Sequence, residues 1–405
     1  MMSKRMKDDY WFGTWGIIPG CLVFLSIPDN ENGSESGEYV SMPLRGRCLQ
    51  RYKLRKEGRM KKCTVAAVMG MVTMGVCAAT SAFAGPKVEF GEDGWLQLSL
   101  LGQVHYSYME DAEEEHDFYL RRGRFIVSGQ VMDGVKVFVE TDYPNAGKNG
   151  VDADFKIQDA WMDVQLFGSK HWVKGGLILL PFSFENRASA GSLLGIDYNG
   201  ETIKFVNDFI WRDYGAALQG SFADRIGYKV GIFDGYDDDN KYSDADLRFT
   251  GRVDVAVLGE VPTGWFYSQD PISDKTYLYV GGGFDHQGEA TLVDDIPRDN
   301  EAWVADFQSG FKLSDMLHLT VNGAWYNWDN SKFDGNTAFV EGGLRYEKIM
   351  GTLKYSYQDP DGGEELNDYT AGLHYYLKGH NARAGVEYRW GDSSDWWLVG
   401  IQFLL

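Results

Sequence analysis

The residues of this sequence whose type and spacing could do chemistry are charged side chains at alternate positions. Arg122 and Arg124 are two positions apart, and residues at this spacing share one face of an extended strand. Counting every second residue along successive segments places charges of both signs on one face. The basic members are Arg122, Arg124, Lys136, Lys174, Lys229, Arg248, Arg252, Arg345, Lys354, Arg383 and Arg389, and the acidic members are Glu140, Asp142, Asp159, Asp163, Asp254, Asp306, Glu341, Glu347 and Glu387.

Two functions are open to such a charged face. Balanced signs predict ion pairs along a water-filled wall, whereas arginines on neighbouring strands would form a ladder that attracts anions by electrostatic focusing. Arg122 and Arg124, together with Arg383 and Arg389 near the end of the chain, are the candidates for a ladder. A shift of one residue would move the charges of any one strand to its other face.

Sequence patterns of enzymes are missing from the chain. It has no G-x-S-x-G, no H-E-x-x-H and no G-x-x-x-x-G-K, and its seven histidines have no partner at metal-ligand spacing. We therefore predict no catalytic residue, no metal site and no cofactor. An adhesin, or an enzyme whose site is built from residues distant in sequence, stays an alternative of another class.

The elements that must position these charges are long strands, because hydrophobic residues alternate with polar ones. Between Trp95 and Tyr108 the apolar side chains fall at every second position over some 14 residues, long enough to cross a bilayer. About sixteen such segments occur, and an even number is typical of bacterial membrane β-barrels. They lie near 95–108, 118–131, 134–143, 154–166, 170–180, 213–223, 226–234, 246–258, 275–289, 301–312, 316–328, 336–348, 350–358, 367–378, 380–390 and 395–405.

Aromatic residues near the ends of these segments favour a membrane barrel over a secreted β-sandwich, because they form girdles at the membrane surfaces. They are Trp95, Tyr108, Trp211, Trp265, Tyr267, Trp325, Trp328, Trp390, Trp396 and Trp397. The predicted fold class is therefore all-β, a transmembrane antiparallel barrel of about 16 strands.

One long connection, 181–212, is predicted to fold into the lumen. Its apolar residues, such as Phe182 and Leu194, are too many for a solvated loop, and a sixteen-stranded barrel without an insert leaves a wide channel. The candidates for the constriction are Pro181, Phe182, Glu185, Arg187 and Asp197. Packing over the mouth or at a subunit contact is the alternative. The connection 259–274, expected to be a short turn, is as long as an outer loop, and the sequence offers no explanation.

The start of the chain predicts export. Residues 60–84 combine a basic start, an apolar stretch and the cleavage pattern Ala82-Phe83-Ala84, which is typical of a signal peptide. Residues 1–59 are then a mis-called start or a disordered extension, and residues 85–405 form the barrel. All four cysteines lie before residue 85, so the predicted mature chain has no disulfide.

The charge of the chain excludes nucleic acid as a partner, since phosphate binding needs a basic surface. The net charge is −20, and without residues 1–84, which hold 12 of 39 basic and 7 of 59 acidic residues, it becomes −25. The acidic excess lies in predicted outer loops, at 109–117, 237–246, 294–301 and 359–368. Acid at the mouth repels anions, and we expect these loops to serve solvation or divalent-ion bridging to lipopolysaccharide.

A family resemblance is present in the first half of the barrel. Six short motifs within roughly 95–258 resemble the phosphate-selective porin O and P family. They are Leu120-Arg121-Arg122-Gly123-Arg124, Gln158-Asp159-Ala160-Trp161, Gly175 to Glu185, Trp211 to Gly215, Gly231 to Gly235 and Gly251-Arg252-Val253. The resemblance implies a trimeric sixteen-stranded barrel with one long inward loop that passes small anionic solutes.

The function predicted from the sequence is a weakly selective porin of the bacterial outer membrane, a passive diffusion channel. Its expected partners are small hydrophilic solutes and inorganic ions, outer-membrane lipid and lipopolysaccharide, and two further copies of the chain in a homotrimer. A truly anion-selective or phosphate-selective porin is the alternative, because the resemblance points to phosphate whereas the acidic outer loops oppose it.

Overall fold

The structure is a computed structural model of the 405-residue chain. It describes residues 85–110, 112, 114–167, 170–200, 204–206, 211–236, 246–262, 264–266 and 272–405. The predicted signal peptide at 60–84 and the segment 1–59 lie outside the described residues.

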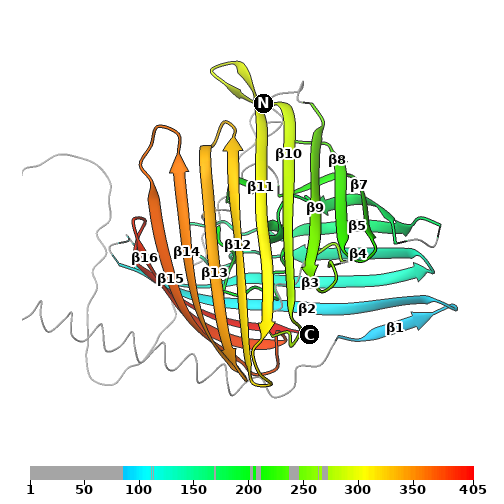
Figure 1. The fold of residues 1–405 in the computed structure, drawn as a ribbon, viewed down its shortest axis with the longest axis horizontal. Coiled ribbons are helices and arrows are strands. Elements are labelled where there is room, and N and C mark those ends of the chain that lie inside the picture. The colour runs from blue at the N-terminus through cyan, green and yellow to red at the C-terminus, as the bar shows by residue number, and fades with distance from the viewer. Residues whose placement is uncertain are drawn as a thin grey trace, which may run out of the picture. The chain divides into compact units, whose positions relative to one another are not determined.

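Seventeen strands form in the described part of the chain, and they follow the predicted segments closely (Figure 1). Their bounds are β1 Lys87–Phe90, β2 Gly94–Met109, β3 His116–Met132, β4 Val135–Asp142, β5 Lys156–Gln165, β6 Trp172–Leu179, β7 Arg212–Phe222, β8 Ile226–Phe233, β9 Arg248–Leu258, β10 Tyr277–Val293, β11 Ile296–Lys312, β12 Leu317–Asp329, β13 Asp334–Tyr346, β14 Ile349–Pro360, β15 Leu366–Tyr376, β16 Ala382–Gly391 and β17 Trp396–Leu404.

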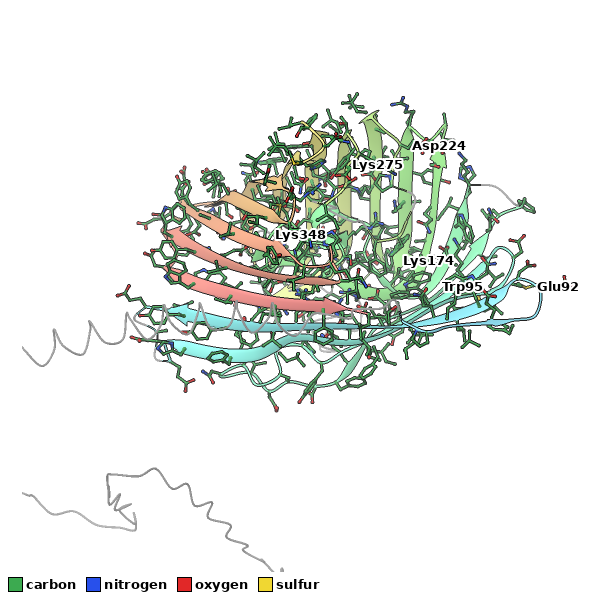
Figure 2. The ribbon with its side chains drawn as sticks, turned by 90° about the horizontal axis from the view of Figure 1, so that it is seen from below. Glu92, Trp95, Lys174, Asp224, Lys275 and Lys348 are labelled. Atoms are coloured by element: carbon green, nitrogen blue, oxygen red, sulfur yellow. The ribbon has the colours of Figure 1, made fainter. Side chains whose placement is uncertain are left out.

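Sixteen of these strands close into an antiparallel barrel. Each strand from β2 to β16 pairs with the next one along the chain, and β17 returns to pair with β2. Strand β1 pairs with the first residues of β2, beyond the point where the β17–β2 pairing ends at Leu404 and Leu101. Figure 2 shows Glu92 and Trp95 at this tip of the sheet, where the chain turns from β1 into β2. The predicted sixteen-stranded fold is confirmed.

Alternation along the strands separates an apolar outer face from a polar inner face. On β3 the phenyl ring of Phe125 is 55% exposed, whereas Arg122 on the inner face is 2% exposed. Exposed apolar residues and buried charged ones reverse the arrangement of a water-soluble protein, and a barrel in lipid with a polar interior has this arrangement. Among the described residues, no helix is long and apolar enough to cross a membrane.

The connection between β10 and β11 differs from its prediction as an outer loop at 294–301. The two strands continue to Val293 and Ile296, and only Asp294 and Asp295 join them. Both aspartates have positive φ, 53° and 63°, as a two-residue hairpin turn of type I′ requires, and aspartate tolerates that conformation. The predicted loop is therefore wrong, because its polar residues pair as strand.

Three of the predicted girdle aromatics lie elsewhere. Trp328 is 2% exposed and shares the inner face of β12 with Tyr326. Trp211 is the last residue of the connection between β6 and β7, hereafter the lumen loop, and donates its indole N–H to the Asn186 carbonyl of the same loop. Trp265 is buried in a second lumen insert described below. Glu347 is also misplaced by the prediction: β13 ends at Tyr346, so Glu347 lies exposed in the following turn. Trp328 has the inward parity of β12, whereas Trp211, Trp265 and Glu347 lie in connections rather than in strands.

Candidate functional site

The connection between β6 and β7 folds into the barrel and contacts its inner wall. The rings of Phe182 and Phe184 pack against Tyr326 and Trp328 of β12, in a cluster that also includes residues of β11 and β13. The backbone N–H of Phe184 donates to Asp306 of β11 at 3.0 Å. Apolar loop residues are therefore buried against the wall rather than exposed to solvent.

The middle of the same connection reaches strands at the other end of the sequence. The guanidinium of Arg383 on β16 donates to the Leu193 carbonyl at 2.5 Å, and the N–H of Ile196 donates to Glu387 at 2.8 Å. The Ala190 carbonyl accepts from Gln103 of β2. These hydrogen bonds satisfy buried backbone groups that would otherwise lack partners. The connection thus lies against wall segments on several sides of the lumen.

Asp197 fixes the loop to β3 through two arginines. Its carboxylate accepts from Arg121 and, at 2.8 Å, from Nη2 of Arg122, and it also accepts the N–H of Tyr198 at 2.8 Å. Burial alone would raise the pKa of Asp197, but Arg121 and Arg122 hold it well below its usual value. Asp197 is therefore ionised and neutralises part of the arginine charge.

A β-bulge makes this double contact possible. Gln103 of β2 faces Arg122, but the next residue, Val104, faces Leu120, so Arg121 has no counterpart and is the extra residue. In regular alternation Arg121 and Arg122 would point to opposite faces, whereas a bulge allows both to turn to one side. Sequence alternation gave no signal for Arg121, because the bulge depends on the partner strand.

The short helix α2, Phe184–Arg187, holds the loop's buried acid. Ser183 caps the helix by accepting the N–H of Asn186, whose side chain accepts from Ser183 in return. Glu185 accepts the N–H of Asn199 at 2.9 Å. Burial raises the pKa of Glu185 to about 8, with a contribution from Glu341, although the Asn199 N–H opposes it. Glu185 is thus mainly protonated at neutral pH.

A second insert comes from the long connection between β9 and β10. Trp265 is 4% exposed, donates its indole N–H to the Leu179 carbonyl at 3.2 Å and packs on β6 to β8. Ile272, further along the connection, packs on Leu194 and Met350 near β14. Because β6 and β14 are eight strands apart in a sixteen-stranded barrel, these residues contact opposite walls. The unexplained length of 259–274 is accounted for by this insertion.

Most basic side chains of the inner face are paired with carboxylates. Arg252 binds Asp306 bidentately, with both N–O distances at 2.6 Å, and also contacts Asp254. The pairs are Arg121 and Arg122 with Asp197, Arg124 with Glu140 and Asp142, Lys174 with Asp163, Arg212 with Asp159, Arg248 with Asp285, Arg252 with Asp254 and Asp306, Arg345 with Asp274, and Arg389 with Asp368. The wall is therefore built as ion pairs.

The nine selectivity candidates separate into groups by position. Arg122 and Arg383 contact the lumen loop directly, and Arg252 also donates to the Phe182 carbonyl. Arg124, Lys174, Arg248 and Arg389 pair with wall carboxylates, and the Lys174 ammonium also lies 5.1 Å from the ring of Trp265 in the second insert. Arg345 contacts the second insert at Asp274, and Lys136 is exposed over the ring of Trp172. Figure 2 shows where Lys174 lies, below the upright strands. Of the four ladder candidates, Arg122 and Arg383 are linked through the side chains of Gln103 and Gln402, whereas Arg124 and Arg389 pair with carboxylates.

The five constriction candidates lie in the folded-in connection. Pro181 and Phe182 are buried directly after β6. Glu185 and Arg187 are buried in α2, with the Arg187 guanidinium 5.1 Å from the ring of Trp265, and Asp197 is held by β3. Missed from the sequence were Arg121, Arg212, which pairs with Asp159, and the inward position of Trp265. Within the described ranges, no group of three or more His, Cys, Asp or Glu residues could hold a metal ion.

Comparison with known proteins agrees with this geometry. Residues 99–258 match the model of the phosphate-selective porin O and P family, from within β2 to the end of β9. The resemblance predicted from the sequence is confirmed over that range. A search of curated proteins finds no match.

Solved structures share the fold at low identity. OmpT, an outer membrane protein of Vibrio cholerae in its trimer form, superposes with a TM-score of 0.53 at 14% identity, covering 78% of this chain and 100% of its own. The outer membrane channel DcaP of Acinetobacter baumannii has a TM-score of 0.52 at 12% identity, covering 80% of this chain and 100% of its own. These likenesses establish the architecture of the barrel.

Proposed function

We propose, from the porin family match over residues 99–258 and the closed barrel, that this chain is a passive diffusion channel of the outer membrane. Small hydrophilic solutes and inorganic ions pass through a lumen narrowed by residues 180–200 and 204–206 of one connection and by Trp265 of another. The mechanism is steric filtering followed by electrostatic interaction with the wall. No catalytic step is part of it.

The observation that supports weak ion selectivity is that most basic side chains of the lumen wall form ion pairs with carboxylates. An arginine ladder attracts anions when its charges are not cancelled nearby, since the field of an ion pair falls off faster than that of a single charge. Arg124 contacts two carboxylates and Arg252 two more. Such a wall presents dipoles rather than a strip of positive potential, so it favours neither anions nor cations strongly.

Export and assembly belong to the same proposal. The pattern at residues 60–84 supports secretion with cleavage before Gly85. A homotrimer is supported by the trimeric form of OmpT, whose barrel fold is similar. Lipid surrounds the apolar outer face, and the acidic residues of the outer connections bind lipopolysaccharide through divalent ions.

A planar bilayer and a liposome swelling assay test the proposal. Folded protein inserted into the bilayer should give stepwise ohmic conductance, and liposomes that contain it should swell in isotonic solutions of small sugars but not of large ones. A folded protein that neither conducts nor permits swelling would refute the channel and leave an adhesin or an enzyme.

Phosphate selectivity is a second candidate, favoured by the name of the matched family. Phosphate selectivity requires basic side chains whose positive charge is not neutralised by neighbouring carboxylates. Millimolar phosphate added to a chloride solution should block the current if such a site exists. The ion pairs of the wall lead us to expect no block.

A further inference from the structure

A cavity of about 200 Å³ lies between the lumen loop and the inner face of β14 to β17. Loop residues 197–200 form one side, and the wall strands form the other. This volume accommodates a solute of several non-hydrogen atoms, since a single water needs only about 10–15 Å³ by the same kind of measure.

On the wall side of the cavity, the strand register places the side chains in rows that run across the strands. Lys354 of β14 faces Thr370 of β15, which faces Arg389 of β16, which faces Trp396 of β17. One row deeper, Gly372 of β15 faces Glu387 of β16, which faces Leu398 of β17. Gly372 contributes no side chain, and the space above it is taken up by Thr352, His374 and the side chain of Glu387, so Lys354 and Glu387 line the cavity from different rows.

Two of the four charged side chains that line the cavity already form ion pairs with residues outside it. Asp197 is held by Arg121 and Arg122, and Arg389 is bound by Asp368 at 2.6 Å. Both side chains are therefore already engaged in ion pairs with residues outside the cavity lining.

The other two, Lys354 and Glu387, are not joined to each other. Within the part of the chain that the structure describes, no carboxylate lies within 4 Å of the Lys354 ammonium, although Glu341 faces it from β13. Glu387 accepts the N–H of Ile196 at 2.8 Å, and its nearest basic group is the buried His374 ring, at 3.6 Å. The cavity therefore presents one cation and one anion with space between them.

We propose that this cavity binds zwitterionic solutes of the α-amino acid class. The solute carboxylate binds the Lys354 ammonium, its ammonium binds Glu387, and an apolar side chain lies against Trp396 and Leu398. Lys354 and Glu387 stand two strands apart, about 10 Å laterally, so their long side chains can bracket a small molecule that carries both charges. Charge-assisted hydrogen bonds at both ends distinguish it from ions of one sign.

Ions of a single charge fit less well. An inorganic anion bound at Lys354 would face the carboxylates of Glu341 and Glu387, and a simple cation bound at Glu387 would face Lys354 and Arg389. Like charges at such distances oppose binding. The inference deepens the proposed function, on which it rests, by naming a class of solute for the channel.

Isothermal titration of the full chain, folded in detergent at pH 7, tests the site with four probes. L-leucine carries both charges, 4-methylpentanoate only the carboxylate, 3-methylbutylamine only the ammonium, and inorganic phosphate is the fourth. We expect L-leucine to bind with a dissociation constant about tenfold or more below that of each other probe. Equal or tighter binding of 4-methylpentanoate or phosphate would overturn the inference in favour of an anion site, and equal binding of the amine in favour of a cation site.

Variants locate the binding. Lys354→Met and Glu387→Gln should each weaken L-leucine binding about tenfold or more, whereas the matched controls Lys348→Met and Glu92→Gln should leave it unchanged. Both control residues are exposed outside the cavity and are labelled in Figure 2. Retained binding in both cavity variants would refute the site. The probe series on the unaltered chain decides the question even if a variant fails to fold.

Conductance of the same preparation separates this inference from the proposed function. Channels that conduct but bind L-leucine no better than its single-charge analogues contradict the zwitterion site alone. A preparation that binds L-leucine but never conducts contradicts the channel and leaves the site standing.

Discussion

Replacing Asp197 with asparagine should make the channel prefer anions. Asp197 is the carboxylate that neutralises Arg121 and Arg122 where the lumen loop meets β3. Asparagine has nearly the same shape and keeps one carbonyl acceptor for the guanidinium groups, but it removes one unit of negative charge. The two arginines then contribute an additional unit of net positive charge to the lumen.

The size of the effect follows from Coulomb's law. A chloride ion passing about 8 Å from the added charge, in surroundings as polar as water, gains about 0.5 kcal/mol, and a potassium ion loses as much. The difference of about 1 kcal/mol raises the chloride-to-potassium permeability ratio about fivefold. Ionic screening reduces this effect, so the measurement belongs at or below about 0.1 M salt.

The assay is the zero-current potential across a KCl gradient, compared between the wild type and the variant. Asp224→Asn is the matched control, because Asp224 is a partly exposed residue in the turn between β7 and β8, where it pairs with Lys170, and Figure 2 labels its position. The control should leave the ratio unchanged. An Asp197→Asn channel that folds and keeps the wild-type ratio would refute the idea that this carboxylate sets the lumen charge.

Three further predictions concern other parts of the molecule. Trp265→Ala should raise single-channel conductance, because it removes the ring packed on the wall beside Leu179; an unchanged conductance would show that Trp265 does not narrow the path. Burial raises the pKa of Glu185 to about 8, so its contribution to holding the loop is complete below its ordinary value of 4.5 and is lost as the pH rises through 8. Ionisation of this buried carboxylate should loosen the loop, so conductance should increase from pH 5 to pH 9 in the wild type and stay level in Glu185→Gln. Parallel pH profiles of the two proteins would show that ionisation of Glu185 does not loosen the loop. N-terminal sequencing of membrane-extracted protein should begin near Gly85, and recovery of residues 1–59 on the chain would contradict the signal peptide.

The strands could be predicted from the sequence because, in a membrane barrel, consecutive residues of a strand must alternate between apolar and polar. Side chains on β2 alternate between lipid and lumen, so a period of two is written into consecutive residues. The long lumen loop was predictable for a similar reason, since Phe182 and Leu194 cannot remain in solvent. In both cases the local sequence carries the information.

The contacts of the lumen were not predictable, because they depend on residues far apart in the chain. The bulge at Arg121 is defined only by its pairing with Gln103 and Val104 on β2. Trp265 is of a residue type that is common in aromatic girdles, and only its contact with Leu179 shows that it lies inside the barrel. Arginines of several strands are buried on the inner face, but whether each one has a carboxylate partner depends on cross-strand register.

The central claim is that a porin barrel with paired lumen charges passes small ions with little preference for sign. The zero-current potential of the wild-type channel in a tenfold KCl gradient tests it most directly. We predict a potential close to zero, which phosphate addition does not change. A potential near the chloride equilibrium value, with current blocked by phosphate, would contradict the claim and show that the lumen arginines act as free positive charges.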